Sequence, residues 1–417
     1  MTVNLETSEE SAQPPRLAEL LPRWLELPVY RGRRTLEEAS GGNALARFAQ
    51  IPFITKRELR DDFPRNFLGT DRILETLLAD NQVEVEHTSG TSEERTPVLL
   101  GRGWWAEQEL RALRLNDSVA RILNSSLEPR RVVLTTPMCN GTVCHSRWSP
   151  RSARTDGVSL SVNQARIPFL LTDDELARMA VETGEWAPLF LDLDPVQGAW
   201  FAMFCERRGI RFPSLKFLLC SYEFESVVHR RILERAFGVP VFNLYGSTET
   251  GHLLMEDEHG RFKPSRDTAF LEVVEVDADG VGDLVVTTLS NDFMPLLRYR
   301  IGDLVQRDGA GAATTYLVHG RARDALTADD GHRVTTLEVD RCFADVEGIA
   351  HYELRQAENG EGRLRFVPDN AGPSTAALRE LTGRLDALLR WPHRIAAEAV
   401  RTLVPAPSGK FRLTAVT

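Results

Sequence analysis

The 417-residue sequence has no block of basic residues, and its formal net charge is −10 at pH 7. Proteins that bind the phosphate backbone of nucleic acids need clustered Lys and Arg, so we expect no nucleic-acid partner. The sequence also has no apolar run near the roughly 20 residues that cross a bilayer, so we expect no membrane partner. Its first residues, MTVNLETSEESAQPP, lack the apolar segment of a signal peptide.

Cysteine is scarce as well. The five cysteines are scattered, odd in number and form no CxxC pair. This usage is typical of the reducing cytoplasm and not of a disulfide scaffold or a structural zinc site, so we predict a cytoplasmic protein. The stretch HLLMEDEHG offers His252 and His259 without a cysteine, and we interpret both as solvated loop histidines.

The length of the chain exceeds the usual size of one hydrophobic core, which predicts two domains. After Phe270 the stretch FLEVVEVDADGVGDLVVTTL alternates apolar and polar residues around a glycine-containing turn, as antiparallel hairpins do. Past Gly320 the pattern predicts a smaller α+β module of about 100 residues. We place the boundary near His319–Asp324, which gives domains 1–319 and 320–417. The predicted fold class is α/β, with parallel and mixed sheets in the large domain.

The middle of the chain predicts a strand–helix–strand unit. KFLLCSYEF and PVFNLYGSTE have the pattern of strands that run into loops, and SVVHRRILERAFG between them predicts a helix ended by glycine. A βαβ unit of this length implies parallel strands, whose carboxyl ends lie at the same sheet edge. SYEF and YGSTE should therefore lie side by side, where open α/β sheets bind ligands.

Capping residues and periodicity predict further elements. These are a helix over 105–124, a helix from the capping box at Thr172–Glu175 to Gly184, a helix from Pro195 to Gly209, a hairpin over 351–368, a helix over 374–390 and a last strand over 397–405.

The first stretch with chemical potential is HTSGTSEERTPV, residues 87–98. Its hydroxyls and Gly90 suit a loop that holds phosphates, yet Glu93 and Glu94 follow them directly. It lacks the G-x-x-x-x-G-K-[ST] pattern of the P-loop. A hydroxyl-rich surface turn is an equally good interpretation of this stretch alone.

Two further stretches suit a nucleotide. In NLYGSTETG, residues 243–251, Tyr245 offers an aromatic face for a base, and Glu249 offers oxygen to a hard cation such as Mg²⁺. In RYRIGDLV, residues 298–305, Asp303 could accept hydrogen bonds from ribose hydroxyls. Taken singly, each stretch is more simply a polar turn.

The fourth stretch is PSGKFR, residues 407–412. A lysine in a Pro-Ser-Gly loop keeps its charge, and at a phosphate site it could offset developing negative charge. By itself, Lys410 is most simply a solvated surface residue.

The order and spacing of these stretches, with IPFITKRELRDDFP before them and GRARD near 322, resemble the adenylate-forming superfamily. The resemblance covers nearly the whole chain and is greatest to the phenylacetate–CoA ligase branch. It implies a large adenylate-forming domain and a small, mobile C-terminal lid. It also implies that a carboxylate and ATP give acyl-AMP and pyrophosphate, and that the acyl group then passes to a thiol, with ATP, Mg²⁺ and coenzyme A as cofactors.

The resemblance carries over to individual positions. It assigns nucleotide binding to the phosphate loop Thr88, Ser89, Gly90, Thr91 and Ser92, to Ser221, Tyr222, Glu223, Asn243, Tyr245, Gly246, Ser247 and Thr248 at the two strand ends, and to Asp303. It assigns catalysis to Lys410, Glu249 (also the metal ligand) and Arg321, and the hinge to Arg323 and Asp324. It places Pro137, Asn140, Gly141, His145 and Phe224 at the acyl site, where small and aromatic residues suit a planar aryl acid.

The resulting hypothesis is an ATP-dependent ligase that activates an acid of the benzoate, anthranilate or phenylacetate type and transfers it to coenzyme A. One alternative hands the acyl group to a carrier-protein thiol or an amine. Another is a non-catalytic nucleotide- or acyl-binding homologue, which would not need Lys410. The resemblance leaves a homodimer open. Because Glu93 and Glu94 stand where the family loop continues into Gly and Lys, we expect weak affinity for ATP.

Overall fold

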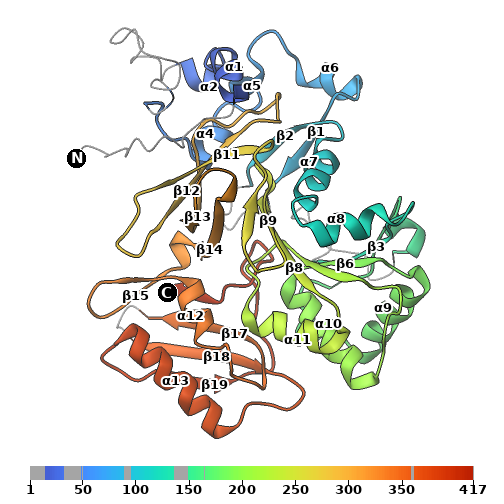
Figure 1. Ribbon diagram of the computed structural model, residues 1–417, viewed down its shortest axis with the longest axis vertical. Coiled ribbons are helices and arrows are strands. Elements are labelled where there is room, and N and C mark those ends of the chain that lie inside the picture. Colours follow the sequence, from blue (N-terminus) through green and yellow to red (C-terminus); the bar gives the residue numbers. More distant parts are fainter. Residues whose placement is uncertain are drawn as a thin grey trace. The chain divides into compact units, whose positions relative to one another are not determined.

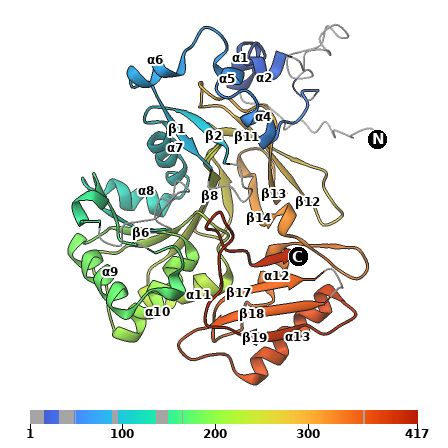
Figure 2. The same ribbon diagram turned by 180° about the vertical axis from the view of Figure 1, so that it is seen from behind.

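The computed structural model describes residues 15–31, 48, 50–88, 95–135, 149–163, 165–357 and 361–416. The chain divides into two compact units. One comprises Met1–Thr88, Glu94–Asn116 and Gly246–Leu317, and the other comprises Ser89–Glu93, Asp117–Tyr245 and Val318–Thr417. Figures 1 and 2 show the elements of each unit from opposite sides.

The first unit has a largely antiparallel arrangement of strands. Its strand order is β11-β12-β13-β14-β10-β9, and the hairpin predicted after Phe270 is confirmed, because β11 and β12 pair antiparallel. Strands β1 and β2 form a separate antiparallel pair. The elements are α1 (Pro15–Trp24), α2 (Pro28–Arg31), α4 (Lys56–Arg60), α5 (Arg65–Leu68), α6 (Leu74–Ala79), β1 (Val83–His87), β2 (Pro97–Gly101), α7 (Trp104–Leu113), β9 (Gly251–Glu256), β10 (Phe262–Pro264), β11 (Ala269–Val274), β12 (Val281–Thr288), β13 (Tyr299–Asp308), η3 (Gly311–Ala313) and the start of β14 (Thr315–Arg321).

The second unit begins with a mostly parallel sheet in the order β8-β7-β6-β3-β5-β4. Strands β7 and β8 pair in parallel on either side of α11, so the predicted βαβ unit is confirmed. Figure 1 shows α10 and α11 beside one another against these strands. The elements are α8 (Asp117–Asn124), β3 (Arg131–Leu134), η1 (Arg151–Arg154), β4 (Thr155–Asp156), β5 (Ser159–Ser161), η2 (Pro168–Leu170), α9 (Asp173–Trp186), β6 (Phe190–Leu193), α10 (Pro195–Arg208), β7 (Phe217–Cys220), α11 (Val227–Phe237) and β8 (Val241–Ser247), whose last two residues belong to the first unit.

The C-terminal part of the second unit has a four-stranded sheet in the order β19-β18-β17-β20. The predicted hairpin is confirmed, because β17 and β18 pair antiparallel. The α/β fold class, with a smaller C-terminal sheet, is also confirmed. The elements are η4 (Ala322–Asp324), β15 (Leu326–Thr327), β16 (Arg333–Val334), α12 (Thr336–Arg341), β17 (Ile349–Gln356), β18 (Gly362–Pro368), α13 (Thr375–Leu389), β19 (Ala396–Ala399) and β20 (Thr414–Val416).

Local sequence signals set several helix ends. The Thr172 side chain accepts a hydrogen bond from the backbone of Glu175, which completes the predicted capping box of α9. The Asp194 side chain caps α10, whose first residue is Pro195 and whose C-cap is Gly209, as predicted. These short-range contacts fix the elements that carry the strand-end loops.

Three predicted boundaries are wrong. The helix predicted over 105–124 is two helices, because the buried Asn116 amide bonds to the Glu256 carbonyl and breaks the run. Helix α9 passes through Gly184 and ends at Trp186. The strand predicted over 397–405 ends at Ala399 and is not the last. Strand β20 follows it and pairs in parallel with β17.

One hydrophobic core runs through the second unit, from strands such as β3 and β7 to the C-terminal sheet. Helix α11 packs against β17, as Figure 2 also shows. One boundary between the two units lies within β14, between Leu317 and Val318. The C-terminal residues belong to the same unit as Asp117–Tyr245. Independent movement of residues 320–417 stays a prediction.

Candidate active site

Glu249 lies at the turn between β8 and β9 and is almost fully buried, at 3% exposed. Its Oε1 accepts a 2.8 Å hydrogen bond from the Tyr299 hydroxyl and lies 3.6 Å from the Lys56 ammonium nitrogen. Burial alone would raise the pKa of this carboxyl group, but Lys56 and Tyr299 outweigh it and hold the pKa below its usual range. The group is therefore a buried carboxylate at neutral pH, and its hard oxygens suit Mg²⁺.

Gly246 precedes this turn at a point where the chain approaches itself closely. A Cβ atom there would lie 2.2 Å from the Gly251 carbonyl oxygen, so no side chain fits. Ser247 and Thr250 share a hydrogen bond of 2.9 Å between their hydroxyl oxygens, and Thr248 is half-buried beside them. The YGSTE sequence thus forms a turn whose hydroxyls gather next to Glu249.

Asp303 lies on β13, four residues after Tyr299, and is buried. The residue before it, Gly302, has a φ of +90°, which side chains rarely adopt. Both predicted carboxylates of the first unit therefore depend on β13, one as a residue of the strand and the other through the Tyr299 hydroxyl.

Thr88 directly follows β1, the strand that precedes the hydroxyl-rich stretch. Its backbone N–H donates to the Thr96 carbonyl at 3.0 Å, and its hydroxyl accepts from the Thr96 N–H at 3.3 Å. This pairing fixes the base of the loop. The other predicted loop residues, and the predicted acyl-site residues except Phe224, lie outside the described residues: Ser89, Gly90, Thr91, Ser92, Pro137, Asn140, Gly141 and His145.

In the second unit, the segment after β7 bends sharply. Tyr222 has a φ of +74°, an unusual value for a residue with a side chain. Asp192 accepts hydrogen bonds of 3.2 Å from the hydroxyls of both Ser221 and Tyr222. Arg131 lies 3.5 Å from the same carboxylate. Asp192 thus stabilises the bend that presents Tyr222 and Glu223 at the carboxyl end of β7.

Lys410 meets this bend. Its ammonium nitrogen donates to the Tyr222 carbonyl oxygen at 2.6 Å, and the next backbone N–H, that of Phe411, donates to both Glu223 oxygens at 3.1 Å. Residues that are 188 positions apart in the sequence are therefore in contact. Lys410 is not simply a solvated surface residue.

Two acidic groups lie close to Lys410. Burial raises the pKa of Asp194 to about 6, against hydrogen bonds from the start of α10 and the charge of Lys410. Burial, and next the charge of Asp194, raise the pKa of Glu223 well above its usual range, while Lys410 opposes the rise. The two carboxyl groups share a hydrogen bond. The ionisation of Glu223, Asp194 and Lys410 is therefore linked, because the lysine favours the charged form of each carboxyl group while burial disfavours it.

The remaining predicted residues on β8 and after β7 have polar contacts in one case and apolar contacts in another. The Asn243 amide donates to Glu225 at 3.0 Å, and Arg230 pairs with the same carboxylate at 2.8 Å. Tyr245 is half-buried on β8. Phe224 packs against the hydrophobic core, so part of its role is structural.

Asp324, one of the two predicted hinge residues, contacts the segment after Lys410. Asp324 is mostly buried, and its carboxylate lies 3.5 Å from Nε of Arg412 and 3.6 Å from Nε of Arg323. Arg321 ends β14 directly before this turn. The GRARD sequence is therefore connected to the Lys410 loop by an ion pair.

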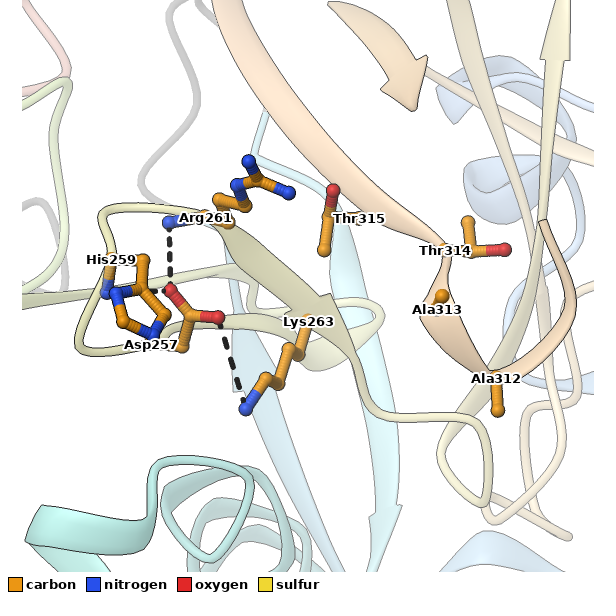
Figure 3. Close-up of a pocket in the computed structure, with 8 residues that line it drawn as sticks. All are labelled: Asp257, His259, Arg261, Lys263, Ala312, Ala313, Thr314 and Thr315. Carbon is orange, nitrogen blue, oxygen red and sulfur yellow. Dashed lines mark hydrogen bonds and ion pairs between the residues drawn. The ribbon is translucent and has the colours of Figure 1, made fainter. Parts of the chain in front are cut away.

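A surface pocket of about 510 Å³ lies in the first unit. Figure 3 shows the Lys263 ammonium group reaching the Asp257 carboxylate, with His259, Arg261 and the segment 312–315 around it. None of the predicted site residues lines this pocket, so it is separate from the predicted site residues of this unit. Nor is His252 a solvated loop residue as predicted: it lies on β9, and its ring nitrogen is 2.9 Å from the Gln108 amide nitrogen.

Sequence reasoning missed several supporting residues. Lys56 and Tyr299 belong to stretches that the resemblance used, IPFITKRELRDDFP and RYRIGD, but nothing local pairs them with Glu249. Asp192 and Asp194 stand in LDLDP, where the Asp-Pro step signals a helix start. Their second role, beside the lysine and the bend, has no local signal.

The comparisons with known proteins concern the chain as a whole. No family model matches the chain. Over 397 residues it is 26% identical to phenylacetate–coenzyme A ligase of Thermus thermophilus, a match that covers 89% of this chain and 83% of that protein. The chain is a homologue of phenylacetate–coenzyme A ligase. The resemblance stated from the order of motifs is confirmed.

Solved structures of other CoA ligases share the fold of this chain. A 2-hydroxyisobutyryl-CoA ligase in its postadenylation state aligns with a TM-score of 0.67 at 20% identity, over 96% of this chain and 88% of that one. The anthranilate CoA ligase AuaEII, in complex with anthranoyl-AMP, aligns with a TM-score of 0.56 at 15% identity, over 80% of this chain and 65% of that one. At these identities the likeness concerns the fold.

Proposed function

We propose that this homologue is an acid–thiol ligase that activates an aromatic carboxylic acid with ATP and transfers the acyl group to coenzyme A. The observation that carries the proposal is the position of Lys410. Its ammonium nitrogen lies 2.6 Å from the Tyr222 carbonyl, at the carboxyl end of β7, the kind of sheet edge at which α/β proteins bind ligands. A non-catalytic binding protein would not need a lysine held in this way.

The first half-reaction joins the acid to AMP. A carboxylate oxygen of the acid attacks the α-phosphorus of ATP, the bond to the bridging oxygen breaks, and pyrophosphate leaves. Negative charge gathers on the phosphate oxygens, so fixed cations and hydrogen-bond donors lower the barrier. Lys410 is the side chain that we assign to this role, and Thr88 fixes the base of the loop that would hold the other phosphates.

A divalent cation fits the first unit. The Glu249 carboxylate is buried and held ionised, and the hydroxyls of Ser247 and Thr250 lie at the same turn. These oxygens are the donors that Mg²⁺ prefers. Glu249 would hold the ion, which supplies positive charge against the phosphates. Asp303 would accept hydrogen bonds from the ribose, and Tyr245 would contact the adenine.

The second half-reaction forms the thioester. The sulfur of coenzyme A attacks the acyl carbonyl carbon, AMP leaves through cleavage of the mixed anhydride, and the thiol proton passes to solvent. In this proposal the residues 320–417 move as a lid about Arg323 and Asp324, so that Lys410 withdraws before the thiol enters. Arg321, which precedes the turn, would take part in the change.

The acid and the acceptor are the finer parts of the proposal. An aryl acid is supported by the relatives, which include a phenylacetate–CoA ligase and an anthranilate CoA ligase. A carrier-protein thiol is the alternative acceptor, and a homodimer in the cytoplasm is the proposed state of the protein. No helix in the described part of the chain is long and apolar enough to cross a membrane.

The test is pyrophosphate release with a panel of aryl and alkyl acids, with and without coenzyme A. Aryl acids should give release, and coenzyme A should convert the adenylate into a thioester that mass spectrometry detects. Lys410→Ala should lower adenylation at least about 100-fold, the scale of one lost transition-state contact, and keep thioester formation from preformed aryl-AMP. Lys216→Ala, an exposed lysine of the same unit, serves as the control. Equal loss of both half-reactions would reject the role of Lys410.

A further inference from the structure

Phe411, which follows Lys410, has contacts on both its backbone and its ring. The backbone N–H donates to both Glu223 oxygens at 3.1 Å. The ring packs edge to face against two neighbouring rings. The centroid distance to the Phe169 ring is 5.6 Å, with an interplanar angle of 74°, and the centroid distance to the His351 ring is 5.0 Å, with an angle of 78°. Edge-to-face packing of this kind favours one ring orientation.

The rings around Phe411 are themselves held. Phe169 packs edge to face on Trp200 of α10, at 5.2 Å. His351 of β17 is buried and lies 3.1 Å from His229 of α11 between ring nitrogens. The Phe411 ring therefore touches groups from both parts of the second unit, the segment 117–245 and the C-terminal sheet.

The chain on either side of Phe411 is tied down too. The turn before it closes through a 2.8 Å hydrogen bond from the Ala406 N–H to the Lys410 carbonyl. Arg412 after it forms the ion pair with Asp324 of the hinge turn. Three consecutive residues thus have separate anchors, and only the anchor of Lys410 involves the reacting side chain itself.

A lysine with a flexible side chain catalyses better when its backbone is already fixed. Less conformational entropy is then lost when the side chain becomes ordered in the transition state. The Tyr222 carbonyl cannot fix that backbone, since it binds the far end of the side chain. The contacts of Phe411 can, because they hold the next residue through a peptide group and a ring at once.

We propose that Phe411, seated on Glu223, Phe169 and His351, is a positioning residue that holds the Lys410 loop for adenylation. This inference rests on the proposed function, and it concerns the first half-reaction, adenylation. Movement of the C-terminal part would separate Phe411 from Glu223 and Phe169, which belong to the segment 117–245. The contacts of Phe411 therefore assist adenylation and not thioester formation.

The experiment compares Phe411→Ala, Phe411→Leu and Phe411→Tyr with the wild type in each half-reaction. Phe411→Ala should lower the kcat of adenylation about 10- to 100-fold, the scale of a misplaced catalytic group. Its rate of thioester formation from preformed aryl-AMP should stay within about twofold. The tyrosine variant keeps the ring edge and should recover most of the adenylation rate, whereas the leucine variant should not.

The control is Val404→Ala, in the same C-terminal segment but 68% exposed. It should change neither half-reaction. Melting temperatures identify variants that fail to fold. An unchanged adenylation rate in Phe411→Ala, or an equal loss in both half-reactions, would overturn the positioning role.

A second measurement does not depend on activity. Acetylation of Lys410 by an amine-reactive reagent, followed by peptide mass spectrometry, should be faster in Phe411→Ala than in the wild type and unchanged in Val404→Ala. An equal labelling rate in all three would overturn the inference. If the wild type releases no pyrophosphate with any acid while labelling differs as expected, the proposed function fails and the loop contact stands.

Discussion

Replacing Tyr299 by Phe tests whether Glu249 works as a buried, ionised carboxylate. The change removes one hydroxyl that donates to Oε1 at 2.8 Å, and it leaves the ring in place on β13. Glu249 is 3% exposed, so water does not readily replace the lost donor. Hydrogen bonds to charged groups contribute about 1.5–3 kcal/mol, and we expect the carboxylate to be destabilised by about that much.

The sign of the pH effect follows from the depressed pKa of Glu249. A carboxylate whose folded pKa is lowered stabilises the folded protein above its unfolded pKa, and this contribution is lost as pH falls through the folded pKa. In Tyr299→Phe the pKa rises, so the protein should be less stable at neutral pH by about 1.5–3 kcal/mol. The acid limb of adenylation should also move to higher pH.

The assay is pyrophosphate release across a pH series, with urea unfolding at pH 7 in parallel. Tyr316→Phe is the matched control, because Tyr316 is a buried tyrosine of the same unit outside the proposed site. An unchanged acid limb together with an unchanged free energy of unfolding would refute the reasoning about Glu249.

Three further predictions concern other groups. Burial lowers the pKa of His229 to about 3. At pH values below 6.5 this group should therefore lower the free energy of unfolding of the wild type by about 1.4 kcal/mol per pH unit. Urea unfolding of His229→Gln at pH 7 and pH 5 should lack this pH dependence. Asp340 is buried and accepts hydrogen bonds from Ser226, Val227 and Tyr352, so Asp340→Ala should lower the free energy of unfolding by about 3 kcal/mol, and an unchanged midpoint would count against it. Glu94→Lys adds positive charge to the hydroxyl-rich stretch and should lower the KM for ATP; an equal or higher KM would reject the expectation of weak ATP affinity.

Much of the second unit was predictable because its signals are local. The capping box at Thr172–Glu175, the Asp194–Pro195 helix start and the glycine after α11 each act over a few residues. Apolar runs flanked by these signals predicted β7, α11 and β8, and parallel pairing followed from their spacing. One error occurs where a distant partner intervenes: Asn116 bonds to Glu256 between two helices whose combined periodicity is continuous.

In the candidate site, too, local sequence motifs could be recognised but distant contacts could not. The motifs supplied Glu249, Asp303, Tyr222 and Lys410, but their partners could not be named from the sequence. The contact of Lys410 with Tyr222 depends on where the chain returns after β19.

The sequence by itself determined which residues are candidates for the chemistry and in what order they occur, because hydroxyls, carboxylates and one lysine stand in recognisable short stretches. Only the tertiary structure decided what holds each of them. Tyr299 and Lys56 keep Glu249 ionised, and Phe411 seats the lysine loop. The physical reason is that strand register and core packing bring these groups together, and both depend on contacts between residues far apart in the chain.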